Sequence, residues 1–303
     1  MDKIKIIPLL ILFFAIFSCT KDKNKPAYSH LLFPIGRAHL GEHEVTLKIN
    51  DQITEPEIVD DGFGGYWIKV PVQGVEKSSE ITVSYLRQKQ TLQLFKENQP
   101  DVDKFLVPVN FIDSDNKTIR DKAVDLCTGI TGNIAKAEKI ASFVNTQLNF
   151  SEYKDAFLDA ASKTYNNGFG ICINYSRLTT ALCRAAGIPT RTVWGIIYNQ
   201  QNSIYDYHHE WTEILDDEGF WHQLDNTNDF IFDLNDIRYL DLYYSSEQNT
   251  FIREHPEYKF LLGDIRFFDG YPAALSGRLN SFNLLENNQP GSMLVEFKYQ
   301  FDN

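Results

Sequence analysis

Residues 170–176 read Gly-Ile-Cys-Ile-Asn-Tyr-Ser, and this short segment is the most informative part of the 303-residue chain. Its cysteine, Cys172, follows a glycine-containing loop and opens an apolar run with the spacing of a helix. The run extends to about Ala186, and Gly187 is then well suited to ending the helix. We therefore expect Cys172 at a helix N-terminus, where unpaired backbone N–H groups favour negative charge on its sulfur.

Two strands are predicted downstream of this helix, over residues 209–215 and 220–226, and an Asp-Asp-Glu-Gly turn joins them. Alternate side chains of a strand share one face, so the positions of His209 and Asp225 can be compared across the hairpin. A turn centred near Asp217 would place Asp225 directly across from His209, and a bulge would still leave the two in reach. The sequence thus brings together a thiol, an imidazole and a carboxylate, which is the equipment of nucleophilic acyl transfer.

Four further residues are candidates for the oxyanion or substrate pocket: Asn166, Asn167, Gly170 and Trp211. Gly170 allows a sharp bend and a close approach of substrate to the sulfur. The backbone N–H of Cys172 can face a developing oxyanion, and either asparagine, in a polar loop expected over 162–170, could supply a second donor. The tryptophan shares the strand face of His209.

The segment ahead of this region has a different period. Apolar and polar residues alternate from Ala38 to about Phe95, with glycines between the runs, which is typical of short strands. This pattern predicts a small β-sandwich over residues 38–98, with the alternative that these strands begin one continuous domain. An Asn-Gln-Pro-Asp sequence at 98–101 marks the boundary.

Residues 99–303 are predicted to form the second domain, in which helices come first and strands follow. The patterns that support this order, beside those already named, lie at 119–126, 134–148 and 190–198. They predict an α+β fold in which helices pack on an antiparallel sheet. Residues 236–303 form a C-terminal extension rich in Tyr and Phe, which ends in a strand over 293–301.

Residues 1–18 have the features of an export signal. Two lysines precede an apolar run that is too short for a comfortable membrane span, since a span needs about 20 residues. The run ends in Ile-Phe-Ser-Cys, which resembles the bacterial lipobox and predicts lipidation of Cys19 after cleavage. Residues 19–37 would then be a tether, and the protein would be exported and lipid-anchored in the bacterial cell envelope, facing the periplasm or the cell surface. The alternative is an ordinary secretory signal with an incidental cysteine.

The net charge limits the classes of partner that the protein is expected to bind. The formal net charge is −12, and removal of residues 1–18, with two lysines and one aspartate, leaves −13. No basic patch suggests nucleic acid, and an acidic protein does not adhere to anionic headgroups, so the lipid would be the sole membrane attachment.

Cys172 and Cys183 are separated by about 16 Å along one helix and cannot pair. The sequence does not decide whether Cys127 and Cys183 form a disulfide. If they do not, Cys183 is expected to be a small buried hydrophobe.

Several segments together resemble the transglutaminase-like core: residues 170–172, 182–191, 209–213, 219–221 and 225–227. The resemblance covers roughly residues 105–230 and implies a papain-like arrangement, with the cysteine on a helix and the histidine and aspartate on adjacent strands. It implies Cys172 as the nucleophile, His209 as the base and Asp225 as the residue that orients the imidazole. The family usually has a small residue after this histidine, and Glu210 in its place alters the expected electrostatics of the pocket.

The resemblance implies cysteine-dependent acyl transfer on peptide or isopeptide amides of a peptide or protein substrate, through a thioester and without a cofactor. Hydrolysis is expected over glutamine–lysine crosslinking, because no feature of the sequence excludes water. Metal catalysis is disfavoured, because His208 and His209 point to opposite strand faces and no His-Glu-x-x-His or paired Cys-x-x-Cys motif is present. The competing interpretation is a non-catalytic surface lipoprotein that binds peptide or glycan through the aromatic residues of 239–271.

Overall fold

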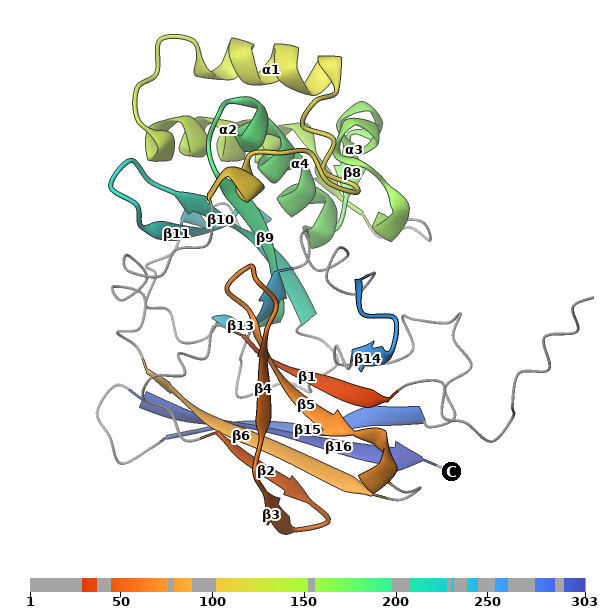
Figure 1. Cartoon of the computed structure of the whole chain (residues 1–303). Coiled ribbons are helices and arrows are strands. Elements are labelled where there is room, and N and C mark those ends of the chain that lie inside the picture. Colours follow the sequence, from red (N-terminus) through yellow and green to blue (C-terminus); the bar gives the residue numbers. More distant parts are fainter. Residues whose placement is uncertain are drawn as a thin grey trace, which may run out of the picture.

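The computed structural model describes residues 29–36, 45–75, 79–88, 102–151, 156–197, 208–227, 230–231, 239–244, 254–260, 276–286 and 292–302. Figure 1 shows helices packed on a sheet at one end of the molecule and a β-sandwich at the other. The expected signal peptide and Cys19 lie outside the described residues. Within the described residues, every helix is too short or too polar for a membrane span.

The β-sandwich consists of two sheets around one apolar core. The first sheet has the order β14-β1-β5-β4, with bounds Tyr258–Phe260, His30–Gly36, Tyr66–Pro71 and Glu57–Asp60. The second has the order β15-β16-β6-β2-β3, with bounds Ser276–Glu286, Ser292–Asp302, Glu80–Gln88, Thr46–Ile49 and Gln52–Thr54. Alternate residues of a strand face the same side, so every second side chain of β16 is buried in this core: Val295, Phe297, Tyr299 and Phe301.

The sandwich differs from the predicted boundaries in two places. Strand β1 lies inside the range 19–37 that was predicted to be a tether, and its residues 31–36 are buried. Strands β15 and β16, predicted to belong to the extension of the second domain, complete the second sheet by pairing with each other and with β6. The reason is that β6 and β2 alone would leave a row of unpaired backbone groups and an apolar face exposed. The terminal strand predicted over 293–301 is confirmed as β16.

The second unit of the fold is an antiparallel sheet covered by helices, which confirms the predicted α+β class. The sheet has the order β12-β11-β10-β9-β13, with bounds Phe230–Ile231, Trp221–Asp225, His208–Leu215, Thr190–Ile197 and Tyr239–Tyr244. The four α-helices of the described chain are α1 to α4, with bounds Lys117–Cys127, Asn133–Gln147, Ala161–Asn167 and Cys172–Ala185. Two short parallel strands form a separate ribbon: β7 (Asn149–Phe150), which follows α2, and β8 (Phe169–Gly170), which precedes α4. Single 3-10 turns are η1 (Val72–Gly74), η3 (Val102–Phe105) and η4 (Ala156–Leu158).

Helix α4 lies at the centre of this unit, between the sheet and the other helices (Figure 1). Its apolar residues Leu178, Ala181 and Leu182 are fully buried in one cluster with residues of α1, α2 and β10. Each of the two leucines contributes about 1.5–3 kcal/mol by leaving water. The helix ends as predicted, because Gly187 follows it with a φ of +77° that favours glycine. The sequence therefore fixes both ends of the element that carries Cys172.

The prediction of a polar loop over residues 162–170 is wrong, because most of this segment forms helix α3 and strand β8. The Asp113 side chain accepts a hydrogen bond from the Ser162 backbone N–H at 3.0 Å, in the first turn of α3. Gly168, at a φ of +72°, ends the helix after two turns. Such a short helix has little apolar periodicity of its own, so contacts with distant residues decide its formation.

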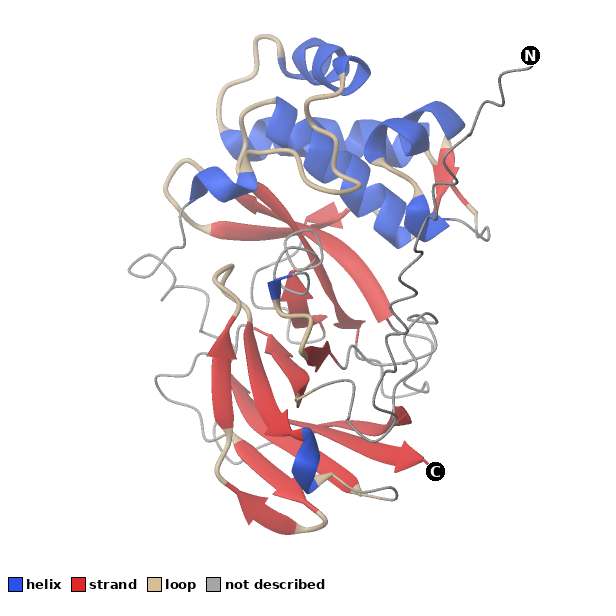
Figure 2. Cartoon of the chain, turned by 45° about the vertical axis from the view of Figure 1, so that its right-hand side comes forward, coloured by secondary structure: helices blue, strands red, loops and turns tan. Residues whose placement is uncertain are grey.

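One loop of the sandwich reaches the sheet of the second unit. The turn between β4 and β5 is closed by Asp61, whose carboxylate accepts the backbone N–H groups of Phe63 and Gly65 at 2.8 and 2.9 Å. The Phe63 ring packs against Val193 of the helix-covered sheet, while the Phe63 carbonyl accepts a bond from Arg191. Burial raises the pKa of Asp61 to about 6, although these hydrogen bonds lower it. Figure 2 shows this hairpin rising from the sandwich toward the sheet.

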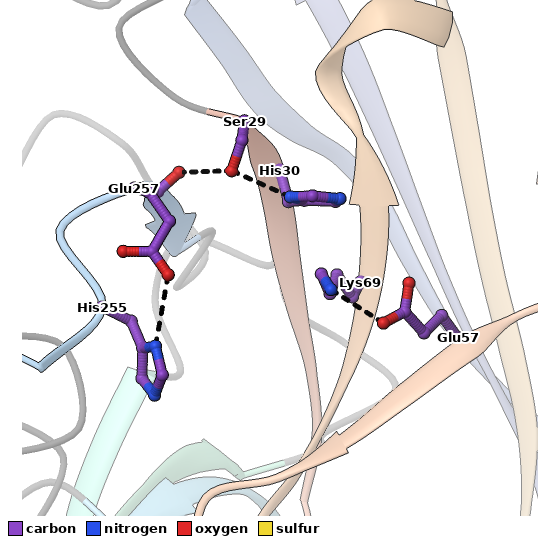
Figure 3. A network of polar contacts seen from close by, with 6 residues as sticks. All are labelled: Ser29, His30, Glu57, Lys69, His255 and Glu257. Atoms are coloured by element: carbon purple, nitrogen blue, oxygen red, sulfur yellow. Dashed lines mark hydrogen bonds and ion pairs between the residues drawn. The ribbon is translucent and has the colours of Figure 1, made fainter.

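A second contact region fastens the short strand β14 to β1, as Figure 3 shows. The Ser29 hydroxyl donates to the carbonyl of Glu257 at 3.1 Å, and the His30 ring lies 2.9 Å from the same hydroxyl. The Glu257 carboxylate pairs with the ring of His255 at 3.3 Å. On the next strand, Lys69 pairs with Glu57 at 2.7 Å in the same region (Figure 3). The bond from Ser29 and the pairing of β14 with β1 join residues 254–260 to the rest of the sandwich.

Candidate active site

Cys172 is the first residue of α4, as the sequence predicts, and it is partly exposed. The turn before it is held by Asn174, which is fully buried. The Asn174 side-chain oxygen accepts a bond from the backbone N–H of Ile171 at 3.0 Å, and its amide donates to the carbonyl of Ala156 at 2.9 Å. Asn174 thus fixes the direction in which the chain enters the helix, and with it the position of the sulfur.

Gly170 is required by this turn for a steric reason. A Cβ atom at this position would lie 2.5 Å from the Asn174 Cβ, far inside normal contact. We expect Gly170→Ala to lower the rate of Cys172 alkylation by iodoacetamide by about tenfold or more, because the turn must shift and move the sulfur. The control is Gly129→Ala, an open position with nothing within 4 Å, although its positive φ carries some backbone strain. Alkylation at the wild-type rate in a folded Gly170→Ala protein would refute this role.

The imidazole of His209 lies between a carboxylate and the thiol. Its Nε2 is 2.7 Å from Oδ2 of the fully buried Asp225, and the Cys172 side chain is its other hydrogen-bonding neighbour. The second carboxylate oxygen of Asp225 accepts the backbone N–H of Thr227 at 3.1 Å. Because Asp225 occupies Nε2, the Nδ1 atom is left for the sulfur, and the carboxylate sets the orientation of the ring.

The register of the hairpin differs from the prediction. Leu215 pairs with Trp221 and Thr212 with Leu224, so the turn is centred near residue 218 rather than 217. Continued along the strands, this register puts Asp225 opposite Trp211 instead of His209. The difference is two residues along the strand, and an even shift keeps Asp225 and His209 on the same face. The predicted contact therefore forms diagonally across the hairpin.

The electrostatics of the site favour a protonated imidazole. Burial lowers the pKa of His209, but the hydrogen bonds and charges of Asp225 and Cys172 outweigh burial and raise the pKa to about 10. A positive charge therefore lies beside the Cys172 side chain, at the N-terminus of α4.

This pKa predicts how stability depends on pH. The protonated His209 imidazole stabilises the folded state, and this contribution is complete below the ordinary pKa of 6.5. It is lost as the pH rises from 6.5 to the folded-state pKa of about 10. We expect the free energy of unfolding to fall by about 2 kcal/mol over this range more in the wild type than in His209→Gln. The matched control is His222→Gln, which breaks another close histidine–carboxylate pair, to Asp216 at 2.7 Å. Equal pH dependence of wild type and His209→Gln in urea denaturation would contradict the assignment.

Comparison with known proteins places this geometry in a family. The model of the transglutaminase-like superfamily matches residues 120–226, within the range of the predicted resemblance. Residues 120–226 belong to the transglutaminase-like superfamily. The transglutaminase-like core thus includes Cys172, His209 and Asp225, and its fold of helices on an antiparallel sheet agrees with the prediction.

Individual relatives are distant. The chain is 25% identical over 228 residues to the uncharacterized protein YebA of Bacillus subtilis (strain 168), a match that covers 67% of this chain and 29% of YebA. The chain therefore spans less than a third of that relative's length. A solved candidate cysteine protease from Cytophaga hutchinsonii is 18% identical with a TM-score of 0.48, over 70% of this chain and 74% of that one. The periplasmic domain of TgpA from Pseudomonas aeruginosa is 14% identical with a TM-score of 0.38, over 64% of this chain and 92% of that one.

The remaining predicted pocket residues have different positions in the core. Trp211 is buried, and its ring lies nearly parallel to that of His209, with centroids 6.4 Å apart. Asn166 and Asn167 are exposed in the last turn of α3. The Asn167 amide donates to Asp159 at 3.2 Å, so it would have to leave this carboxylate to act as an oxyanion donor.

Glu210, the residue that departs from the family pattern, does not share the strand face of His209. It points to the opposite face of β10, where it is buried and accepts a hydrogen bond from the Ser176 hydroxyl of α4. Ser176 lies one helical turn after Cys172, and Glu210 directly follows His209. This hydrogen bond therefore joins the helix that carries Cys172 to the strand that carries His209. Sequence reasoning did not assign Ser176 or Asn174, although both lie within one turn of Cys172.

The three cysteines of the described chain, Cys127, Cys172 and Cys183, are free. The disulfide between Cys127 and Cys183 that the sequence left open is not formed in this structure. Cys183 is fully buried, as predicted, and burial raises the pKa of its thiol. Its sulfur is therefore protonated and inert. Among the described residues, no three His, Cys, Asp or Glu side chains gather where they could hold a metal ion.

Proposed function

We propose that this protein is a cysteine-dependent enzyme that cleaves peptide or isopeptide amides through a thioester, with hydrolysis as the net reaction. The observation that carries the proposal is the position of the His209 imidazole, between the Asp225 carboxylate and the thiol at the start of α4. Nucleophile, base and orienting group in mutual contact are the signature of covalent acyl transfer.

The reaction would proceed in two steps. The Cys172 thiolate attacks the amide carbonyl carbon, forming a C–S bond while the negative charge moves to the carbonyl oxygen, which the Cys172 N–H can face. The C–N bond then breaks, and the protonated His209 gives its proton to the leaving amine. In the second step, His209, now neutral, takes a proton from water, which attacks the thioester. The C–S bond then breaks, the carboxylic acid is released, and the Cys172 thiolate and the protonated His209 are restored.

Exposure of the site supports water as the acceptor. Cys172 is partly exposed, and the His209 side chain keeps an exposed fraction of 12%. An amine acceptor would give crosslinking by the same chemistry, because it can attack the thioester in place of water. Water at its bulk concentration reaches an open thioester more often than a dilute lysine side chain does.

The deciding experiment offers the enzyme both acceptors. Glutamine-containing peptides are incubated with a labelled primary amine, and mass spectrometry separates hydrolysed products from amine adducts. We expect hydrolysed products to dominate and to disappear in Cys172→Ala. A majority of amine adducts would instead establish crosslinking as the activity of this site.

We propose in addition that the protein is exported and held on the cell envelope by a lipid on Cys19. The lipobox resemblance supports this, and the net charge of −12 disfavours attachment by headgroup electrostatics. We expect Cys19→Ala to move the protein from the membrane fraction to the soluble fraction, since a lipid anchor would be its only attachment. The measurement is fractionation and immunoblotting of expressing cells, and a Cys19→Ala protein that stays with membranes would refute the anchor.

A further inference from the structure

Large apolar side chains are exposed in an uneven way along the described chain. Eight such side chains are exposed, and four of them lie between residues 150 and 169, just ahead of the nucleophile. Single exposed apolar residues are normal on protein surfaces, so what distinguishes these four is that their segments adjoin the start of α4. We call these four the apolar rim: Phe150 at 60% exposure, Phe157 at 38%, Leu158 at 66% and Phe169 at 37%.

The segments of the apolar rim are attached to the start of α4. Phe169 precedes Cys172 by three residues, which span at most about 11 Å. Phe150 pairs with Gly170 in the β7–β8 ribbon, where neighbouring strands lie about 4.8 Å apart. Figure 1 shows β8 beside α3 and close to α4.

The turn η4 brings the other two residues of the apolar rim to the same helix. Its Ala156 carbonyl accepts the Asn174 amide at 2.9 Å, and the Phe157 carbonyl accepts the Arg177 guanidinium at 2.8 Å. The backbone of η4 is thus fixed to the first two turns of α4, while the side chains of Phe157 and Leu158 remain exposed to solvent.

We propose that the apolar rim binds bulky apolar side chains of the peptide substrate next to the bond that is cleaved. This inference rests on the proposed function, and it adds the class of substrate: segments with Leu, Ile, Met or Phe close to the reacting carbonyl. An extended peptide advances by about 3.3–3.6 Å per residue, so side chains one to three residues from a carbonyl at Cys172 come within reach of Phe169. Such side chains gain by leaving water against apolar groups, whereas charged ones gain nothing there.

The side chains of Phe150 and Phe169 differ in orientation, and this predicts that a bound peptide contacts them unequally. Phe169 is aligned with Asn149 and Phe150 with Gly170, and adjacent residues of a strand face opposite ways. The two rings therefore lie on opposite faces of the β7–β8 ribbon. A peptide that binds along one face should depend on one ring and not on the other.

The test compares single variants on a proteome-derived peptide library, with cleavage sites identified by mass spectrometry. The variants are Phe150→Ser, Leu158→Ser and Phe169→Ser. Ile53→Ser is the matched control, because Ile53 is 78% exposed on β3 at the far end of the molecule (Figure 1). Alkylation of Cys172 by iodoacetamide, a reagent too small to need the apolar rim, reports whether the catalytic site is intact.

For the wild type we expect sites enriched in bulky apolar residues within three positions of the cleaved bond. At least one apolar-rim variant should lose this enrichment and about tenfold in kcat/KM through a higher KM, with unchanged alkylation. Unchanged site preference in all three variants, or no apolar enrichment in the wild type, would overturn the proposal. If the wild type is alkylated but cleaves nothing, the proposed hydrolysis fails. The apolar rim is then judged by retention of library peptides on immobilised Cys172→Ala: retained apolar peptides support it, and their absence overturns it.

Discussion

Cys172→Ala is expected to abolish amide cleavage, with a loss of about 10⁴-fold or more in kcat/KM. The alanine keeps the helix start and the Asn174 contacts, because neither involves the sulfur. It removes only the atom that forms the thioester, and no other described thiol can replace it, since Cys183 is buried and Cys127 lies at the end of α1. The measurement is peptide cleavage followed by mass spectrometry, with far-ultraviolet circular dichroism as the test of folding.

The control for this experiment is Cys127→Ala, which removes another partly exposed thiol and should leave kcat/KM unchanged. Alkylation gives an independent measure: Cys172 should react with iodoacetamide faster than a cysteine of the unfolded chain. If Cys172 reacts no faster, and Cys172→Ala still binds peptide or glycan as the wild type does, the protein is a binding module and not an enzyme.

Asp225→Ala is expected to lower kcat/KM by about 10³-fold, because it leaves the imidazole without the group that holds its Nε2. Asp225→Asn keeps the shape of the side chain, and its amide oxygen can accept the same hydrogen bond when the ring has the matching tautomer. It removes the negative charge, however, and so lowers the pKa of His209 from about 10 toward its ordinary range. The alkaline limit of the activity should therefore move to lower pH in Asp225→Asn.

The measurement is kcat/KM between pH 5 and pH 11 for the wild type and both variants. The matched control is Asp216→Asn, which removes the carboxylate of the His222 pair at the other end of the hairpin. Identical profiles for the wild type and Asp225→Asn would show that the carboxylate charge does not control the imidazole. Full activity of Asp225→Ala would remove Asp225 from the mechanism.

Much of the site follows from the sequence because each of its main residues lies in a locally defined element. Gly187 ends α4, and the strand period of β10 puts His209 on a definite face. The register that relates His209 to Asp225 could not be predicted, because the turn conformation sets it and composition does not reveal it. The alternation of side chains between the two faces of each strand was enough to place both side chains on one face.

The contacts behind the site were harder to predict because they join distant residues. The link from Ser176 to Glu210 spans 34 positions, and neither residue shows a pattern that indicates a partner. Helix α3 was missed for the same reason, since its first turn is bonded to Asp113 far upstream. The sandwich was assigned to residues 38–98 because alternation identifies a strand but does not reveal its neighbour, and β6 pairs with β16 across more than half of the chain.

The sharing of the sandwich between both ends of the described chain has a consequence for the order of events during synthesis. Ser29 bonds to Glu257, 228 positions later, and β6 must wait for β16 to emerge from the ribosome before its edge is covered. The transglutaminase-like core can collapse while the sandwich is still incomplete, since its helices and strands are contiguous in the chain. The nascent protein therefore carries one uncovered edge of β6 and its apolar face until the last strands are made, and these are the residues that a holdase chaperone would have to protect.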